Sequence, residues 1–295
     1  MVMAAVGLAT TAPTAVAAAP YVMERSDVRT MTSSAGERYT IYIHRPAAPA
    51  PASGYRVLYL LDGDDSFPVA AQTAERMARF GRDEGYGGLL VVAIGYAPED
   101  MMERRAYDYT PTSGTDTDRA GRRTGGADAF RHFLAEELKP AIEEEFAVDE
   151  TREAVWGHSY GGLFVLDTLL REPGLFDVYI ASSPAIWFGD HKVLEGLAGL
   201  AARLERAGPR VVSVSVGELE QNLPEADPED REAVARRERI MDARMVDASR
   251  ALAQRLAEFD DLTVYQRVST GEDHAATPLS GIAQAVQLAS GVAPQ

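Results

Sequence analysis

The sequence predicts the α/β class, with a doubly wound and mostly parallel sheet that carries helices on both faces. Short apolar runs alternate along the chain with longer stretches whose apolar residues repeat at helical spacing. The run LLVVAIG at 89–95 is apolar at nearly every position, which is typical of a parallel strand buried on both faces. No repeat period or long linker divides this pattern, so we expect a single domain over residues 21–295.

Seven runs are expected to form the strands of this sheet. The first alternates apolar and polar residues more than the others, which favours an antiparallel edge strand. In chain order the runs are YTIYIH (39–44), RVLYLL (56–61), LLVVAIGY (89–96), EAVWG (153–157), DVYIAS (177–182), RVVSVSVG (210–217) and LTVYQRV (262–268).

Helical spacing of apolar residues predicts helices over 127–146, 160–171 and 229–259. The last of these has a stripe typical of a helix that faces the core, so its methionines are expected to pack there. The members of this stripe are Ile240, Met241, Met245, Ala248, Leu252, Leu256 and Phe259. Residues 97–126 lack periodicity and are expected to form a long loop above one sheet end, while 222–230 form an acidic, turn-rich segment.

Composition excludes several classes of function. The 295-residue chain is 46% apolar, which suits a well-filled core, and its formal net charge is −16. A nucleic-acid partner is not expected, because such proteins need a basic surface. The chain has no cysteine, so a disulfide framework, a thiolate metal site and a cysteine nucleophile are all excluded. No apolar run is long enough to span a bilayer.

The first twenty residues, MVMAAVGLATTAPTAVAAAP, are almost uncharged and end in a run of small residues that resembles a signal-peptidase site. No basic residue precedes the apolar stretch, so a disordered tail is the alternative interpretation. The Ala-rich run ending in A-x-A favours the remnant of a leader, and we expect a periplasmic or secreted protein.

The motif GHSYGG at 157–162 predicts a nucleophilic serine, Ser159. In a G-x-S-x-G motif the serine lies at a sharp turn between a strand and a helix, and the glycines let neighbouring backbone approach closely. EAVWG before the motif is a predicted strand, and LFVLDTLL after it is a predicted helix. A chance Gly-Ser turn is the alternative that this context disfavours.

A serine hydroxyl needs a base, and the usual base is histidine. His274 follows the last predicted strand, where a doubly wound hydrolase places its base, although a surface loop histidine remains the alternative. The other four histidines lie in an early strand, on a packing helix, inside the serine motif and at the start of a helix: His44, His132, His158 and His191.

The carboxylate partner of the histidine is expected after the strand that lies between the serine and histidine strands. Glu218 and Glu220 both follow Gly217 there, and the spacing G-x-x-acid favours Glu220 without excluding Glu218. The order Ser159, Glu220, His274 is then the nucleophile, acid, base order of the α/β-hydrolase fold.

The oxyanion hole is expected to use the backbone N–H groups of Tyr160, directly after the serine, and of Asp64, in the loop after an early strand. The acidic stretch DGDD at 62–65 is compatible in composition with calcium. An EF-hand spacing from Asp62 would require glycine at 67 and glutamate at 73, where Phe67 and Thr73 stand, so no metal is expected.

These residues together resemble the putative-esterase branch of the α/β-hydrolases, and within it the bacterial siderophore esterases that cleave trilactones. The likeness covers nearly the whole chain in order. It rests on LYLLDG (58–63), RRAYDYTP (104–111), GGADAFRHFLAEELKP (125–140), GHSYGGLFVLDTLL (157–170), SSPAIWF (182–188), GELEQ (217–221) and GEDH (271–274). The resemblance implies an α/β-hydrolase fold and a cofactor-free esterase with Ser159 and His274 as the catalytic pair.

The expected function is therefore that of a serine carboxylic-ester hydrolase acting on a small-molecule ester through an acyl-enzyme. The loop over 101–125 carries five arginines and four carboxylates in a strongly acidic chain, which favours an anionic aryl ester with Arg105 as its contact. A solvated loop with internal ion pairs is the alternative. An acyltransferase on the same chemistry, or a catalytically silent binding protein, are the alternative functions.

Overall fold

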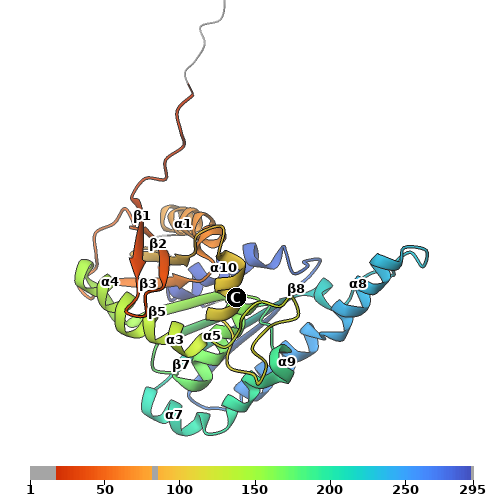
Figure 1. Cartoon of the computed structure of the whole chain (residues 1–295). Coiled ribbons are helices and arrows are strands. Elements are labelled where there is room, and N and C mark those ends of the chain that lie inside the picture. The colour runs from red at the N-terminus through yellow and green to blue at the C-terminus, as the bar shows by residue number, and fades with distance from the viewer. Residues whose placement is uncertain (1–17, 82–85, 294–295) are drawn as a thin grey trace, which may run out of the picture.

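The computed structural model describes residues 18–81 and 86–293 (Figure 1). The predicted leader, residues 1–20, lies almost entirely outside the described residues, so export stays a prediction. Within the described ranges, no helix combines the length and the apolar character needed to cross a bilayer.

One eight-stranded sheet forms the centre of the molecule, with the strand order β1-β2-β4-β3-β5-β6-β7-β8 (Figure 1). β1 pairs antiparallel with β2, β2 pairs antiparallel with β4, and every later neighbouring pair is parallel. The predicted doubly wound, mostly parallel sheet is confirmed. The strands are β1 (Ser26–Thr32), β2 (Arg38–His44), β3 (Tyr55–Leu60), β4 (Leu89–Gly95), β5 (Val148–His158), β6 (Val178–Ser182), β7 (Arg210–Gly217) and β8 (Leu262–Ser269).

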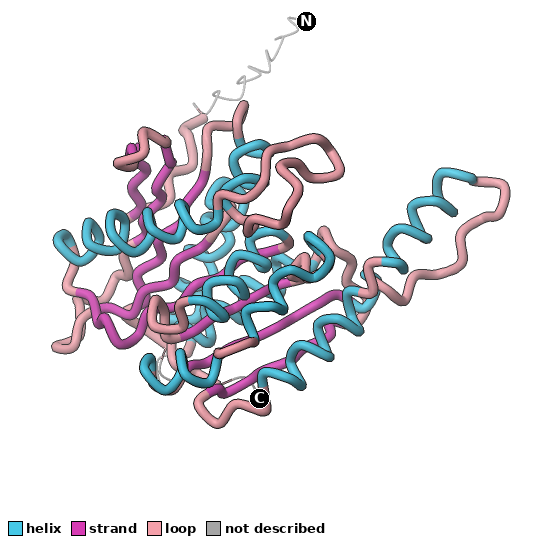
Figure 2. Tube along the Cα trace, turned by 60° about the horizontal axis from the view of Figure 1, so that its bottom comes forward, coloured by secondary structure: helices cyan, strands magenta, loops and turns pink. Residues whose placement is uncertain are grey.

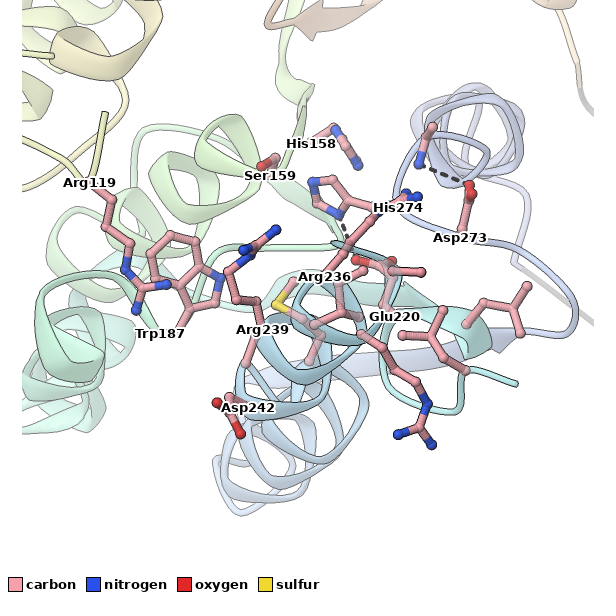
Figure 3. Close-up of a pocket in the computed structure, with 18 of the residues that line it drawn as sticks. Arg119, His158, Ser159, Trp187, Glu220, Arg236, Arg239, Asp242, Asp273 and His274 are labelled. Atoms are coloured by element: carbon pink, nitrogen blue, oxygen red, sulfur yellow. Dashed lines mark hydrogen bonds and ion pairs between the residues drawn. The ribbon is translucent and has the colours of Figure 1, made fainter. Parts of the chain in front are cut away.

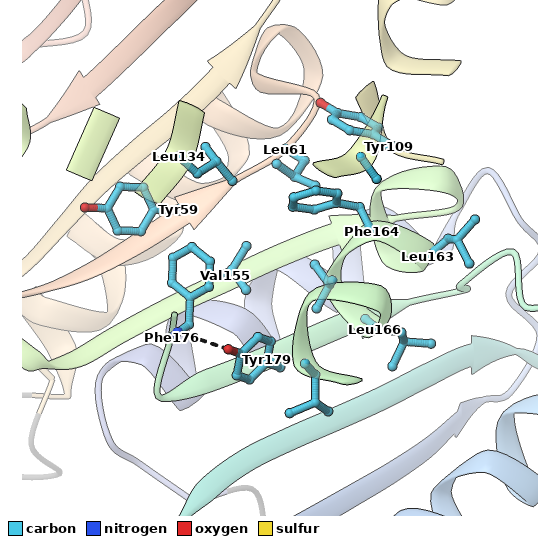
Figure 4. Packing of buried hydrophobic residues seen from close by; sticks show 14 of the residues in the cluster. Tyr59, Leu61, Tyr109, Leu134, Val155, Leu163, Phe164, Leu166, Phe176 and Tyr179 are labelled. Atoms are coloured by element: carbon cyan, nitrogen blue, oxygen red, sulfur yellow. Dashed lines mark hydrogen bonds between the residues drawn. The ribbon is translucent and has the colours of Figure 1, made fainter. Parts of the chain in front are cut away.

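Helices cover both faces of the sheet because successive side chains of each buried strand point to opposite faces. On β3, Tyr59 joins the apolar cluster of one face together with Phe164 of α5 (Tyr160–Arg171), as Figure 4 shows. Its neighbour Leu60 joins the cluster of the other face with Phe67 of α1 (Gly63–Phe80) and Ile282 of α10 (Thr277–Ala289). The sheet is therefore the middle of three layers.

Shorter helices complete the two outer layers. A π-helical turn, Leu134–Leu138, interrupts the predicted helix over 127–146 directly before Pro140, whose ring and missing N–H disturb regular helical hydrogen bonding. The remaining helices are α2 (Met101–Asp108), α3 (Ala127–Phe133), α4 (Lys139–Glu145), α6 (Phe188–His191), α7 (Leu200–Ala207), α8 (Arg231–Asp242) and α9 (Met245–Leu256).

Three expectations about the elements were wrong. The first predicted run, β2, is antiparallel but interior, because the edge is formed by β1, whose largely exposed residues give no apolar signal. The segment 97–126 is not one continuous loop, since it contains α2. The predicted helix over 229–259 is two helices, α8 and α9, separated at Arg244, whose φ of 45° is left-handed.

The break at Arg244 divides the predicted apolar stripe between α8 and α9. Met245, Leu252 and Leu256 of α9 are buried against the sheet, whereas Met241 of α8 is exposed. No residue of α8 is buried, and in both views this helix extends away from the rest of the molecule (Figures 1 and 2). The described residues of α8 thus contribute little to the core.

The sheet also determines where the functional residues meet. β3, β5, β6, β7 and β8 are parallel neighbours, so their carboxyl ends lie at one edge of the sheet. The residues that follow these ends are those expected to carry the chemistry: Asp62 to Asp64, Ser159, Ser183, Glu220 and His274. An open α/β sheet binds its ligands at this edge.

The two halves of the predicted stripe, in α8 and in α9, are expected to contribute differently to the free energy of unfolding. Leu256→Ala should lower the free energy of unfolding by about 2 to 5 kcal/mol, because a fully buried leucine leaves a cavity. The matched variant Ile240→Ala, in α8, should lower it by less than about 1 kcal/mol. Urea unfolding followed by circular dichroism measures both. Equal losses would mean that α8 packs as firmly as α9.

Candidate active site

Ser159 lies at the sharp turn between β5 and α5 with φ 58° and ψ −116°. Few residues other than glycine adopt such a backbone, and they do so only where the surroundings hold them. The Ser159 N–H donates to the Ser182 carbonyl at 3.1 Å, and the Ser159 carbonyl accepts from the N–H groups of Leu163 and Ala185. The turn predicted from the motif is present, and its backbone is held from three sides.

The glycines of the motif allow β5 and α5 to approach each other. A Cβ atom at Gly157 would lie 2.4 Å from the backbone carbon of Gly161, and one at Gly162 would lie 2.9 Å from the Ser182 carbonyl oxygen. Both distances are shorter than real Cβ atoms permit. A side chain at either position would push the helix away from the strand and move Ser159.

Glu220 and His274 form a direct pair. Glu220 Oε2 lies 2.6 Å from His274 Nδ1, and the carboxylate is 3% exposed. Because a carboxylate only accepts hydrogen bonds, Nδ1 is the donor in this pair, so in the neutral ring Nε2 is the nitrogen with the lone pair. Figure 3 shows the His274 ring between Glu220 and Ser159. The structure thus brings together the three residues that the sequence placed at three separate strand ends.

Glu218, the alternative acid, has a different partner. Its carboxylate accepts the Gly271 N–H at 3.0 Å and so fixes the loop that carries His274. Glu220 Oε1 in turn accepts the Gly217 N–H at 2.8 Å. These bonds orient Glu220 inward and Glu218 toward the loop.

Sequence reasoning missed a set of polar residues around Glu220. Ser183 follows β6 in a left-handed conformation, φ 44°, and its hydroxyl donates to Glu220 Oε1 at 2.5 Å. Thr277 Oγ1 lies 3.0 Å from Ser183 Oγ and 3.3 Å from His158 Nε2. The available signal was the position of Ser183 directly after a parallel strand, which is also where Ser159 lies.

His158 is a neutral neighbour of this pair. Its ring centroid is 4.5 Å from that of His274. Burial, followed by the nearby charges of His274 and Arg105, lowers the pKa of His158 to about 3. An uncharged His158 does not oppose a positive charge on His274.

Ser159 and His274 line the same cavity, and His274 is half exposed. In the described part of the chain their side chains make no direct hydrogen bond with each other. Such bonds are often long without substrate and shorten when substrate binds.

The two predicted oxyanion-hole donors lie in the first turns of two helices. Tyr160 is the first residue of α5 and Asp64 the second of α1. N–H groups at these positions have no acceptor within their own helix, so they are available to a ligand. The Asp64 carboxylate accepts from Tyr42 and from the Tyr96 N–H, which ties its loop to the sheet. Their role as oxyanion donors stays a prediction.

Arg105 already has an ionic partner. Its Nε and Nη2 lie 2.9 Å and 3.0 Å from the two oxygens of Asp62, and its guanidinium lies over the rings of Tyr109 and Tyr160. It borders a smaller, neighbouring cavity and not the one that Ser159 lines. The contact between Arg105 and substrate therefore stays a prediction, and the observed contact holds the loop before Asp64.

The cavity of Ser159 has a volume of about 1350 Å³. One wall is formed by Trp187, with Arg119 over its ring at 5.2 Å. Helix α8 also lines this cavity and contributes arginines that the sequence analysis did not single out, as Figure 3 shows in part. These are Arg236, Arg237 and Arg239.

Comparison with known proteins agrees with this geometry. The model of the Esterase family, described as "Putative esterase", matches residues 32–287. The ferri-bacillibactin esterase BesA of Bacillus subtilis is 34% identical over 211 residues, which are 68% of this chain and 73% of the relative. The siderophore triacetylfusarinine C esterase of Aspergillus fumigatus is 31% identical over 272 residues, 86% of this chain and 89% of the relative.

A solved structure shows the same likeness in three dimensions. The BES protein from Bacillus cereus superposes with a TM-score of 0.80 at 30% identity, covering 94% of this chain and 98% of that one. The predicted resemblance to siderophore esterases and the predicted fold are therefore confirmed. The chain belongs to the Esterase family and is an ester hydrolase.

Proposed function

We propose that this protein is a serine esterase that cleaves a siderophore-type or other anionic aryl ester through an acyl-enzyme on Ser159. The observation that carries the proposal is the Glu220–His274 pair beside a serine in strained backbone geometry, in one cavity. The names of the related siderophore esterases support the substrate type.

In the first half-reaction Ser159 Oγ attacks the carbonyl carbon of the ester. His274 Nε2 accepts the serine proton as the new C–O bond forms, and the resulting imidazolium is stabilised by Glu220, which already accepts from Nδ1. The tetrahedral intermediate collapses when the C–O bond to the alcohol breaks. The same proton then passes from His274 to the departing alkoxide, leaving the acyl-enzyme.

The negative charge on the carbonyl oxygen needs donors that are fixed in advance. The N–H groups of Tyr160 and Asp64 are assigned this role, because both lie in the first turn of a helix and lack intrahelical acceptors. The Arg105–Asp62 ion pair holds the second of these loops in place. Removing one such donor typically costs about 10²- to 10³-fold in kcat.

In the second half-reaction water attacks the acyl carbon, and His274 accepts a proton from the water. The bond from the acyl carbon to Ser159 Oγ then breaks, His274 returns the proton to Oγ, and the carboxylic acid leaves. The half-exposed His274 is accessible to solvent, which favours hydrolysis over transfer to another alcohol. A cavity of about 1350 Å³ exceeds the usual range of roughly 300 to 1,000 Å³ for small-molecule sites and favours a bulky ester. A catalytically silent binding protein would not need the Glu220–His274 pair.

Ser159 and His274 are expected to act as one unit. Ser159→Ala should lower kcat for a p-nitrophenyl acyl ester by about 10⁴-fold or more, and His274→Ala by a similar factor. The double variant should be little worse than either single variant, because each residue is needed for the same step. Multiplicative losses, or near-full activity of Ser159→Ala, would contradict the acyl-enzyme mechanism.

Substitutions of Glu220 and Glu218 should have clearly different effects on kcat. Glu220→Gln is expected to lower kcat by about 10²- to 10⁴-fold, because the amide no longer stabilises the imidazolium and disturbs the His274 tautomer. Glu218→Gln should retain most activity and serves as the matched control from the same turn. Steady-state kinetics on one neutral ester measures both. The reverse order would assign the acid to Glu218.

Ser183 should act through Glu220. Ser183→Ala removes the 2.5 Å hydrogen bond to Oε1, and we expect kcat to fall by about 10-fold with KM unchanged. Its neighbour Ser182 is the control, because its hydroxyl is buried without a partner among the described residues, so Ser182→Ala should be nearly neutral. The pH profile of kcat should move only in the Ser183 variant. Identical profiles would make Ser183 merely structural.

A further inference from the structure

The arm formed by residues 222–243 includes α8, a helix that does not pack into the core. No residue of α8 is buried, yet this helix forms one wall of the cavity that Ser159 and His274 line. Ala233, Arg236, Arg237 and Ile240 line that wall, at the spacing of one helical face. Ile240, which the sequence analysis assigned to the core, therefore lines the cavity.

Two arginines on this wall are free to bind an anion. Both arginines belong to α8 and line the cavity. Among the described residues, neither Arg236 nor Arg239 makes a hydrogen bond or an ion pair. Arg237 differs, because its Nε donates to the Pro224 carbonyl at 3.0 Å. This hydrogen bond joins α8 to the segment of the arm that precedes it. These two guanidinium groups line the same cavity as Ser159, in a chain whose net charge is −16.

Among the described residues, the carboxylates that line the cavity form no ion pair with these arginines. Glu220 is held by His274, Ser183 and Gly217. Asp273 accepts from the N–H groups of Ala275 and Ala276.

Two further carboxylates, Asp190 and Asp242, also line the cavity. Both are exposed, and neither pairs with an arginine in the described residues. Most acidic residues of the arm precede or begin α8, where Asp230 accepts from the N–H groups of Glu232 and Ala233. The acidic residues of the arm are thus concentrated ahead of α8 and at its start, whereas three of its four arginines line the cavity.

The part of the cavity beside Trp187 suits a planar group. Trp187 lines the cavity, and the Arg119 guanidinium lies over its ring at 5.2 Å. A flat aryl group can pack on the indole, while guanidinium groups offer paired donors to a planar anion. Figure 3 shows Arg119, Trp187, Arg236 and Arg239 around one opening with Ser159 and His274.

We propose that the arm is the element that selects the substrate, with Arg236 and Arg239 binding an anionic group carried on an aryl ring that packs against Trp187. This inference rests on the proposed ester hydrolysis and names its substrate class. The proposed anion site is therefore on α8 and not at Arg105, which the sequence favoured but which pairs with Asp62.

The test uses two p-nitrophenyl esters of equal size and equal leaving group. One has 3-(4-carboxyphenyl)propanoate as its acyl part, and the other has the uncharged 3-(4-carbamoylphenyl)propanoate. The full-length R236Q/R239Q variant should lose about 10- to 100-fold in kcat/KM on the carboxylate ester and less than about 3-fold on the amide ester. The control R231Q/R255Q removes the same charge from exposed positions outside the cavity and should lose less than about 3-fold on both.

A binding measurement separates this inference from the proposed function. Calorimetry on Ser159→Ala with the non-hydrolysable 3-(4-carboxyphenyl)propanamide should show binding that R236Q/R239Q weakens about 10-fold or more. Equal losses on the two esters, or equal losses in the control variant, would overturn the arm as an anion site while leaving ester hydrolysis intact. Hydrolysis that Ser159→Ala does not impair would instead overturn the proposed function, whatever the binding result.

Discussion

The parallel alignment of β3, β5, β6, β7 and β8 is the constraint on which the rest of the site depends. Because these strands run in one direction, their carboxyl ends meet at one edge, and residues more than 200 positions apart become neighbours. Helices on both faces bury the strands and keep their ends in register. The chemistry then needs only short turns after each strand, and the Glu220–His274 contact is made between two such turns.

Two unfavourable features are stabilised at this edge. Ser159 and Ser183 both adopt positive φ angles, which cost about 1 to 3 kcal/mol each. Glu220 is a carboxylate that is 3% exposed, which is unfavourable without partners. The hydrogen bonds of Gly217, Ser183 and His274 satisfy this carboxylate. The same bonds that offset its burial also orient the histidine, so stability and proposed catalysis depend on one set of contacts.

Much of this arrangement could be predicted from the sequence, because strands and strand-end turns have local signals. Apolar runs located seven strands, and the glycines of GHSYGG indicated the turn at Ser159. β1 gave no signal because most of its residues are exposed. Spacing left Glu218 and Glu220 open, since which side chain points inward is decided by Gly271 and Gly217, partners that spacing does not reveal.

The arm shows a different limit of sequence reasoning. An apolar stripe at helical spacing predicts that a face is covered, but it does not say whether a core or a ligand covers it. Leu252 and Leu256 are buried in the core, whereas Ile240 lines the cavity. The sequence did not single out Arg236, because its position relative to Ser159 depends on the break at Arg244, which neither glycine nor proline announces.

The central claim is that the Glu220–His274 pair activates Ser159, and covalent labelling with a fluorophosphonate tests it most directly. Trypsin releases residues 153–171 as one peptide in which Ser159 is the single serine, so the site of reaction can be read by mass spectrometry. The account predicts one adduct per chain, on this peptide, formed at least about 100-fold more slowly in His274→Ala. No adduct, an adduct on another peptide, or an equal rate without His274 would contradict it.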